Sequence, residues 1–201
     1  MTGRLVVVEG IDGSGKTELI RALGNLPRSL FTREPTLGPY GKALREAFGR
    51  GERLSREAER ALIEADRRQH VELVISPALA RGEIVVCDRS FYSTAAYQGL
   101  SVEDARSIVR DNMQFAPRPD VLVFLDLPPV FALARIQARG EKPTAPESYE
   151  TLVACAARYE SVWADPELMR GITFIRIDAR EPLDIVTAAA RRAVDSALQR
   201  S

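Results

Sequence analysis

The chain is poor in side chains that form cross-links or bind metals, because its 201 residues include only two cysteines and one histidine. Cys87 and Cys155 do not have the spacing of a zinc site or of a disulfide framework, so neither is expected. Cys87 lies in an apolar run and is predicted to be a core residue. For His70 we expect a helical surface or packing role rather than catalysis.

Long hydrophobic runs are also missing, and no stretch approaches the length needed to span a membrane. The N-terminus enters a strand-like run without a signal-peptide pattern, which indicates a cytoplasmic protein. Neither sign of charge prevails, since Lys+Arg and Asp+Glu each number 28. We therefore expect neither polymeric nucleic acid nor a membrane as a partner, and local cations must bind any polyanionic ligand.

Apolar runs alternate with helical patterns, which predicts an α/β fold of one domain over residues 1–201. The expected architecture is a three-layer sandwich with a five-stranded parallel sheet flanked by helices, and the Gly-x-x-x-x-Gly-Lys-Thr motif at residues 10–17 predicts that it is of the P-loop NTPase type. Strands are expected at 5–9, 30–33, 84–87, 121–125 and 172–177. Helices are expected at 16–23, 41–48, 56–81, 92–97, 102–115, 130–139, 147–163 and 183–198. The third helix should begin after an N-cap at Ser55, kink at Pro77 and end at Gly82.

Residues 10–17 have the sequence Gly-Ile-Asp-Gly-Ser-Gly-Lys-Thr, a complete P-loop that follows an apolar run and precedes a helical pattern. Glycines let the backbone wrap a phosphate, and the N–H groups of the loop and the following helix favour anionic oxygens. Lys16 can reach the β- and γ-phosphates of ATP, while Thr17 can hold Mg²⁺. The predicted ATP-binding residues are Gly10, Gly13, Ser14, Gly15, Lys16 and Thr17.

Short motifs follow the P-loop in a definite order. They are Thr32-Arg33-Glu34-Pro35, Ala65-Asp66-Arg67-Arg68-Gln69-His70-Val71, Asp88-Arg89, Ala96-Tyr97-Gln98-Gly99, Pro119-Asp120 and Leu125-Asp126-Leu127-Pro128-Pro129. With residues 8–17, this set resembles bacterial thymidylate kinases in order and rough spacing over nearly the whole chain. Each motif alone is weakly specific, whereas the ordered set is strongly so. The resemblance implies a homodimer that transfers a phosphoryl group from ATP to a deoxynucleoside monophosphate, foremost thymidylate (dTMP).

The resemblance also implies residue roles on the acceptor side. Asp12 would bind the 3′-hydroxyl of the sugar, and Arg67 would hydrogen-bond the base. Tyr97 would pack beside the sugar and disfavour a 2′-hydroxyl. The remaining implied residues are Arg33 and Arg89 on the acceptor phosphate, Asp88 near Mg²⁺ through water, and Thr94 and Gln98 along the same pocket. Simpler roles compete, namely a turn for Asp12, helix packing for Tyr97 and an ion pair for Asp88 with Arg89.

A lid is expected around residues 136–148, where two prolines and mixed charge separate two predicted helices. A plain surface loop is the alternative. Arg135 and Arg139 lie four residues apart and share a helix face that leads into this segment. Because the P-loop has no arginine of its own, the resemblance implies a transition-state arginine from the lid, with Arg139 the first candidate and Arg135 the second.

The sequence departs from the family pattern in four places. Ile63 stands where the family usually has a phenylalanine that stacks on thymine, and loses the extra ~0.5–1.5 kcal/mol of an aromatic pair. Glu18 follows the P-loop where a small or polar residue is usual. Residues 36–39 replace a segment with two glycines and a threonine, and residues 143–146 replace an Asp-Arg pair of the lid.

These departures leave several functions open. The chain is either a divergent active kinase with an altered base preference or a nucleotide-binding homologue with little activity. A kinase that phosphorylates a nucleoside hydroxyl is a further alternative, because Asp88-Arg89-Ser90 is similar to the Asp-Arg-Ser of deoxynucleoside kinases. A nucleotide-dependent switch is also considered, although neither Asn25 nor Asn112 is followed by lysine, as guanine-reading switches require.

Overall fold

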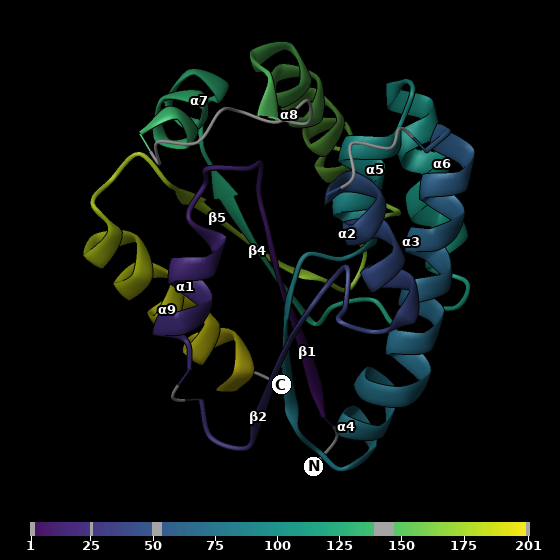
Figure 1. Cartoon of the computed structure of the whole chain (residues 1–201). Coiled ribbons are helices and arrows are strands. Elements are labelled where there is room, and N and C mark those ends of the chain that lie inside the picture. Colours follow the sequence, from purple (N-terminus) through teal and green to yellow (C-terminus); the bar gives the residue numbers. More distant parts are fainter. Residues whose placement is uncertain (1–2, 25, 50–53, 139–146, 200–201) are drawn as a thin grey trace.

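A computed structural model describes residues 3–24, 26–49, 54–138 and 147–199. At its centre is one five-stranded sheet in which every neighbouring pair of strands is parallel, in the order β2-β3-β1-β4-β5 (Figure 1). The strands are β1 (Arg4–Glu9), β2 (Ser29–Arg33), β3 (Ile84–Asp88), β4 (Val121–Asp126) and β5 (Thr173–Asp178). The predicted fold class is therefore confirmed, and each strand agrees with its predicted range to within one residue at either end.

The central strands are almost entirely apolar because helices cover both faces of the sheet. In β1, Leu5 to Val8 are each at most 3% exposed, and β4 is equally buried up to Leu125. The register pairs Val8 with both Asp88 and Val123. The carboxyl ends of β1, β3 and β4 therefore meet at one edge, where an open α/β sheet forms its ligand crevice.

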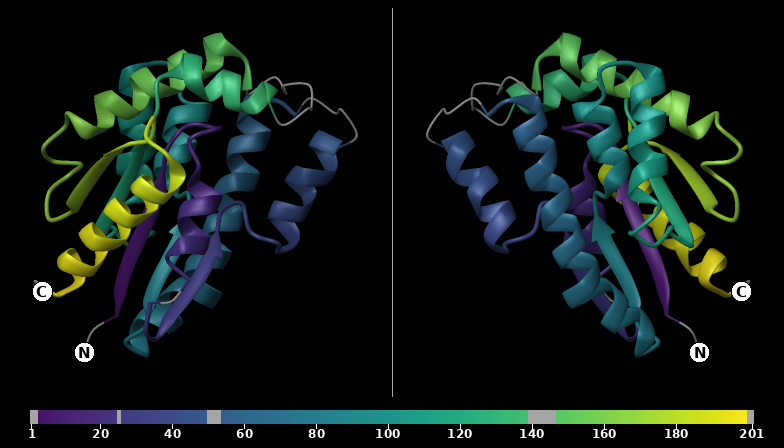
Figure 2. Two further views of the ribbon diagram at one scale, coloured as in Figure 1. Left: turned by 90° about the vertical axis from the view of Figure 1, so that its left-hand side faces the viewer. Right: turned by 90° about the vertical axis from the view of Figure 1, so that its right-hand side faces the viewer.

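The helices form two layers around the sheet (Figure 1). On one face α1 packs against α9, and on the other α5 packs against α3, α6 and α8. Helix α2 packs against α3 at one side of the molecule (Figure 2). The bounds are α1 (Lys16–Ala22), α2 (Pro39–Gly49), α3 (Arg56–His70), α4 (Ser76–Ala80), α5 (Phe91–Gln98), α6 (Val102–Asn112), α7 (Pro129–Gln137), α8 (Tyr149–Trp163) and α9 (Leu183–Gln199). Within the described ranges, no helix has both the length and the apolar character needed to cross a membrane.

The single helix predicted over residues 56–81 is wrong in detail. The Ser55 hydroxyl caps it as predicted, accepting a hydrogen bond from the Ala58 N–H at 3.1 Å. After α3, however, the chain forms a π-helical segment (Val71–Ile75) before α4 begins. Pro77 lacks an N–H and disrupts the α-helical ladder, which accounts for a change of helix type in the turn before it. Gly82, with a φ of 73°, ends this series of helical segments as predicted.

Candidate active site

The P-loop joins β1 to α1 at the carboxyl edge of the sheet. Gly13 has a φ of 82°, and a Cβ atom there would lie 2.7 Å from the carbonyl oxygen of Ala132. Gly10 is similarly restricted, because a Cβ atom would lie 2.9 Å from the carbonyl oxygen of Leu125. The loop therefore has a backbone path that side chains would block. The N–H groups of Asp12 and Ser14 already donate to protein oxygens, so the other N–H groups of the loop and of the start of α1 are the ones that suit an anion.

Lys16 is buried at the start of α1, with its ammonium group turned back over the loop. Its Nζ donates hydrogen bonds to the carbonyl oxygens of Gly10 at 2.9 Å and Ile11 at 3.0 Å. Burial, together with the positive charge of Arg89, lowers the pKa of Lys16 to about 8. An incoming phosphate would supply the negative charge that this buried cation requires.

Asp12, Arg89 and Tyr97 form a polar cluster beside the P-loop. The Arg89 guanidinium makes an ion pair with Asp12 Oδ1 and donates to Ser93 Oγ at 3.1 Å. The Tyr97 hydroxyl accepts from the Asp12 N–H at 2.9 Å and donates to Asp12 Oδ2 at 3.0 Å. Burial alone would raise the pKa of Asp12, but Arg89, Lys16 and Tyr97 lower it below its usual value. The residues predicted to bind the sugar and the acceptor phosphate thus meet in one hydrogen-bonded cluster that contains an ion pair.

Two polar atoms near this cluster are buried without a hydrogen-bond partner in the described part of the chain. They are Asp88 Oδ1, at the carboxyl end of β3, and Ser14 Oγ, in the P-loop. A buried polar atom without a partner costs free energy, so a ligand, ion or water is the expected partner at each. Thr17, in contrast, is exposed in the first turn of α1 and open to a ligand.

Glu9 lies beneath the cluster and was missed by the sequence reasoning. Its carboxylate accepts hydrogen bonds from Ser90 Oγ at 2.9 Å, Ser93 Oγ at 2.6 Å and the Tyr159 hydroxyl at 2.7 Å. Burial raises the pKa of Glu9 above its usual value, and these donors oppose that shift. The contacts fix the first turn of α5 directly after Arg89, whose φ of 69° turns the chain there.

A pocket of about 750 Å³ opens next to the cluster, a volume typical of small-molecule sites. Predicted acceptor residues supply much of its lining, and these are Asp12, Ile63, Arg67, Arg89, Thr94, Tyr97 and Gln98. The other lining residues are Glu34, Pro35, Leu44, Phe48, Leu54, Arg56, Glu59, Asp66, Ser90, Ser93 and Thr151. The structure therefore brings together seven of the eight predicted acceptor-binding residues.

Two further predicted residues, Arg33 and Arg135, are not among the residues that line this pocket. Arg33 ends β2 with an exposed side chain and is not part of the lining. Arg135, in the last turn of α7, donates a hydrogen bond to the carbonyl oxygen of Ala179 at 2.8 Å. Arg139 and residues 140–146 of the predicted lid fall outside the described residues.

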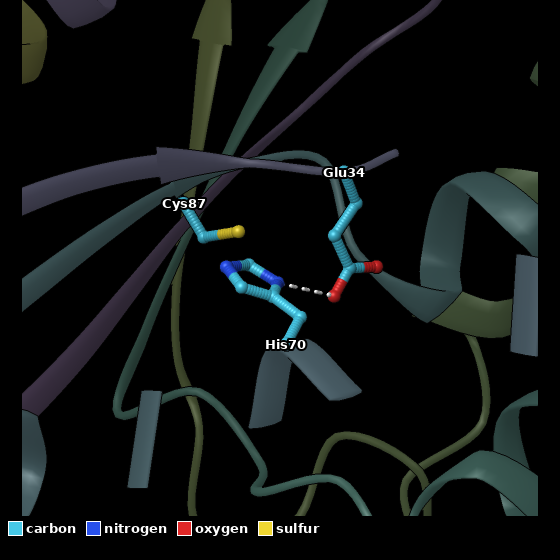
Figure 3. A group of neighbouring side chains, drawn as sticks. All are labelled: Glu34, His70 and Cys87. Carbon is cyan, nitrogen blue, oxygen red and sulfur yellow. Dashed lines mark hydrogen bonds and ion pairs between the residues drawn. The ribbon is translucent and has the colours of Figure 1, made fainter. Parts of the chain in front are cut away.

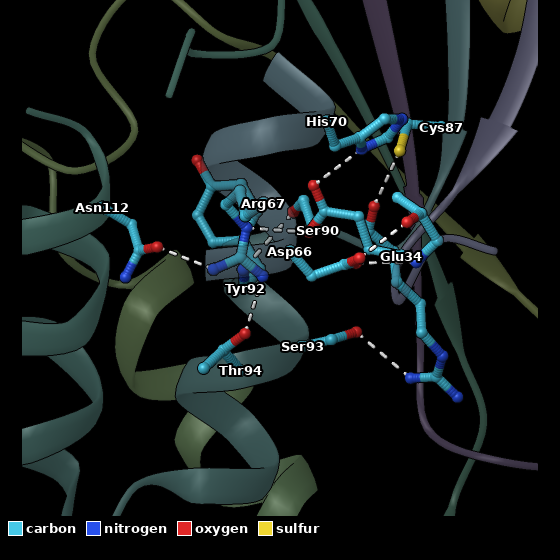
Figure 4. Close-up of polar contacts among 12 residues, drawn as sticks. Glu34, Asp66, Arg67, His70, Cys87, Ser90, Tyr92, Ser93, Thr94 and Asn112 are labelled. Carbon is cyan, nitrogen blue, oxygen red and sulfur yellow. Dashed lines mark hydrogen bonds and ion pairs between the residues drawn. The ribbon is translucent and has the colours of Figure 1, made fainter. Parts of the chain in front are cut away.

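Arg67 is almost fully enclosed, at 2% exposure, yet its guanidinium is well paired. Nε donates to Glu34 Oε2 at 2.7 Å, Nη1 to Asn112 Oδ1 at 2.6 Å and Nη2 to Thr94 Oγ1 at 2.8 Å (Figure 4). Burial alone would raise the pKa of Glu34, but Arg67 and His70 lower it. Three separate segments thereby fix the predicted base-binding arginine.

Glu34, His70 and Cys87 place potential ligand atoms for a metal within 4.8 Å of one another (Figure 3). These atoms already contact other groups of the same chain. His70 Nδ1 contacts Glu34 Oε1 at 3.2 Å and His70 Nε2 contacts Thr32 Oγ1 at 2.6 Å, while the Cys87 thiol donates to the carbonyl oxygen of Arg89. Burial raises the pKa of Cys87 well above its usual value, which keeps the thiol protonated. Of the two roles expected for His70, surface or packing, the structure supports packing, because the buried ring connects Glu34 to Thr32.

The family model described as thymidylate kinase matches residues 8–189 of this chain. This chain belongs to the thymidylate kinase family. A thymidylate kinase of Xanthomonas campestris pv. campestris (strain B100) is 43% identical over 201 residues, covering 98% of this chain and 85% of that protein. One of Xylella fastidiosa (strain M23) is 46% identical over 158 residues, covering 76% of this chain and 72% of that protein. The predicted resemblance and the predicted enzyme class, a nucleoside monophosphate kinase, are confirmed.

The pocket also has an apolar wall that sequence reasoning did not identify. Leu44 and Phe48 come from the same face of α2, and Leu54 comes from the segment that precedes α3. Asp66 secures α2 because its carboxylate accepts from the Thr36 N–H at 2.7 Å, the Thr36 hydroxyl at 2.6 Å and the Gly41 N–H at 3.1 Å. The helix itself was predicted at 41–48, but no local signal shows that its apolar face lines the pocket.

Proposed function

We propose that this member of the thymidylate kinase family transfers the γ-phosphoryl group of ATP to dTMP, giving ADP and dTDP. The observation that carries the proposal is the cluster of Asp12, Arg89 and Tyr97, which lies between the P-loop and the pocket. A P-loop alone binds a donor nucleotide. This cluster adds an anion and a cation suited to a sugar hydroxyl and an acceptor phosphate.

On the donor side, the loop N–H groups and Lys16 hold the ATP phosphates. Mg²⁺ fits this site because Asp88 has a buried oxygen without a partner and Thr17 is exposed beside the loop. Thr17 would bind the ion directly, and Asp88 would bind it through water. When bound, Mg²⁺ neutralises charge on the transferring phosphoryl group.

On the acceptor side, Arg89 binds the dTMP phosphate, Asp12 accepts the 3′-hydroxyl proton in a hydrogen bond, and Tyr97 packs on the sugar. Arg67 donates to the base, which Ile63 and the apolar wall cover. Arg33, which is exposed at the end of β2 and outside the pocket lining, would have to turn toward the pocket to bind this phosphate. Arg139 is the first candidate for the arginine that stabilises the transition state when the lid closes, and Arg135 is the second. The active form is a homodimer in the cytoplasm.

The acceptor identifies the reaction, so the test measures ADP production from ATP and Mg²⁺ with each deoxynucleoside monophosphate and with thymidine. Stimulation by dTMP above every other acceptor is expected. Stimulation by another monophosphate alone would overturn the assignment of the base. Stimulation by thymidine alone would indicate a nucleoside kinase, and slow hydrolysis without dependence on an acceptor would indicate a switch.

The lowered pKa of Lys16 predicts that kcat/KM for ATP depends on pH, whereas kcat at saturating ATP does not. Because the Lys16 pKa is about 8, its positive charge is lost as pH rises through that value, and kcat/KM for ATP should fall roughly tenfold per pH unit above it. Bound phosphates raise the pKa of Lys16, so kcat at saturating ATP should remain constant to higher pH. The measurement is the pH profile of both constants between pH 7 and 9.5 at roughly constant ionic strength.

Lys16→Arg is the matched variant, since its guanidinium stays charged throughout this range. Its kcat/KM for ATP is expected to be lower but constant with pH. A wild-type profile that does not decline above pH 8, or an equal decline in Lys16→Arg, would rule out Lys16 as the group responsible.

A further inference from the structure

Two side-chain hydrogen bonds connect α3 to α5 along the pocket. Arg67 Nη2 donates to Thr94 Oγ1 at 2.8 Å, and Gln98 Nε2 donates to Glu59 Oε1 at 2.7 Å. Thr94 and Gln98 lie four residues apart on one face of α5, and all four side chains line the pocket. On α3, Ile63 lies between Glu59 and Arg67 on the same face.

The contact between Glu59 and Gln98 determines the orientation of the amide group. An ionised carboxylate only accepts hydrogen bonds, so Glu59 must receive Gln98 Nε2–H rather than face Oε1. Burial raises the pKa of Glu59, and the hydrogen bond from Gln98 opposes that shift, so the contact stabilises the ionised carboxylate. Oε1 is then turned away from Glu59, and no hydrogen bond reaches it from the residues described here.

Arg67 contributes the opposite type of group. A guanidinium has five N–H donors, of which three are bonded to Glu34, Asn112 and Thr94, so two remain for a ligand. Because Arg67 cannot accept a hydrogen bond, its remaining groups suit an acceptor on the ligand, such as a carbonyl oxygen. The side of the pocket formed by α3 and α5 therefore combines fixed donors from Arg67 with a fixed acceptor from Gln98.

Building on the proposed function, we propose that Glu59 is a positioning residue that holds the Gln98 carbonyl toward the acceptor base. Arg67 and Gln98 together then select a pyrimidine whose edge places a carbonyl oxygen beside a ring N–H, as thymine and uracil do. Cytosine would place an amino group against Arg67 and an unprotonated ring nitrogen against Gln98 Oε1. Neither pair forms a hydrogen bond, and a site built for hydrogen bonding rejects such a mismatch strongly.

The test is Glu59→Gln, assayed with dTMP and dCMP. Glutamine can donate as well as accept, so Gln98 is free to turn its amide group over. We expect kcat/KM for dTMP to fall about tenfold, mainly through KM, and the ratio of kcat/KM for dTMP over dCMP to fall by at least as much. Glu64→Gln is the matched control on α3, because Glu64 pairs with Arg60 and lies outside the pocket lining.

The double variant Glu59→Gln/Gln98→Glu separates positioning from a merely structural contact. In it, the amide introduced at position 59 donates to the carboxylate introduced at position 98, whose second oxygen is necessarily an acceptor toward the base. Recovery of the preference for dTMP is expected. Wild-type turnover of dTMP with an unchanged dTMP to dCMP ratio in Glu59→Gln would overturn this inference alone, whereas failure of the wild type to use dTMP would overturn the proposed function itself.

Discussion

Replacing Arg89 with alanine is expected to lower kcat/KM for dTMP by about a thousandfold, the scale on which charge-stabilising groups act in phosphoryl transfer. The variant loses the cation placed for the acceptor phosphate. It also leaves Asp12 without its ion-pair partner, and unpaired negative charge next to the acceptor adds to the loss. Steady-state kinetics at saturating ATP, with dTMP varied, measure the effect.

Arg118→Ala is the matched control, because Arg118 bonds carbonyl groups at the surface, those of Glu167 and Arg170. It should retain wild-type kinetics. Circular dichroism and thermal unfolding should show that Arg89→Ala still folds, since Arg89 is partly open to solvent. Wild-type-like turnover in Arg89→Ala would contradict the assignment of the acceptor phosphate site.

The second large effect is on stability and concerns Glu34. In Glu34→Ala, the enclosed Arg67 guanidinium loses its carboxylate, and breaking a buried ion pair in this way costs about 3–5 kcal/mol. For a chain of this length, each kcal/mol lowers Tm by roughly 2–4 °C. Calorimetry or denaturant unfolding should show the loss, with a smaller one in Glu34→Gln, which keeps an acceptor.

Asp195→Ala provides the comparison, since Asp195 forms a partly exposed pair with Arg191 within α9. Pairs of that kind contribute only about 0.3–0.5 kcal/mol. The pKa of Glu34 is lowered from 4.5, so its contribution should be complete above that pH and disappear as pH falls through the folded-state pKa. A wild-type Tm in Glu34→Ala would show that another group compensates the buried charge of Arg67, and would contradict the stabilising role given to Glu34.

The parts of the site that sequence predicted are those with a local signal. The P-loop spacing, the apolar runs before Arg89 and Asp88, and the motif around Tyr97 each carry their information within a few residues. Parallel strands then bring their carboxyl ends together, so the meeting of Asp12 with Arg89 follows from the fold class.

The residues that sequence missed depend on contacts between distant segments. In the sequence, Glu9 is only a charged residue at the end of an apolar strand. Its role depends on Tyr159, which lies 150 positions later and contacts it in the fold. Glu34 acquires its role from Arg67, which is 33 positions away, and Asp66 from Thr36. The π-helical segment was missed because periodicity does not distinguish a local change of helix type from a simple kink.

The most direct test of the central claim is the fate of the γ-phosphoryl group in a reaction of the wild-type enzyme with labelled ATP, Mg²⁺ and dTMP. Separation of the products should show label in dTDP, in amounts equal to the ADP formed, with little label in inorganic phosphate. Label released as inorganic phosphate, at a rate that does not depend on dTMP, would show that this chain hydrolyses ATP without transferring phosphate and would contradict the proposed function.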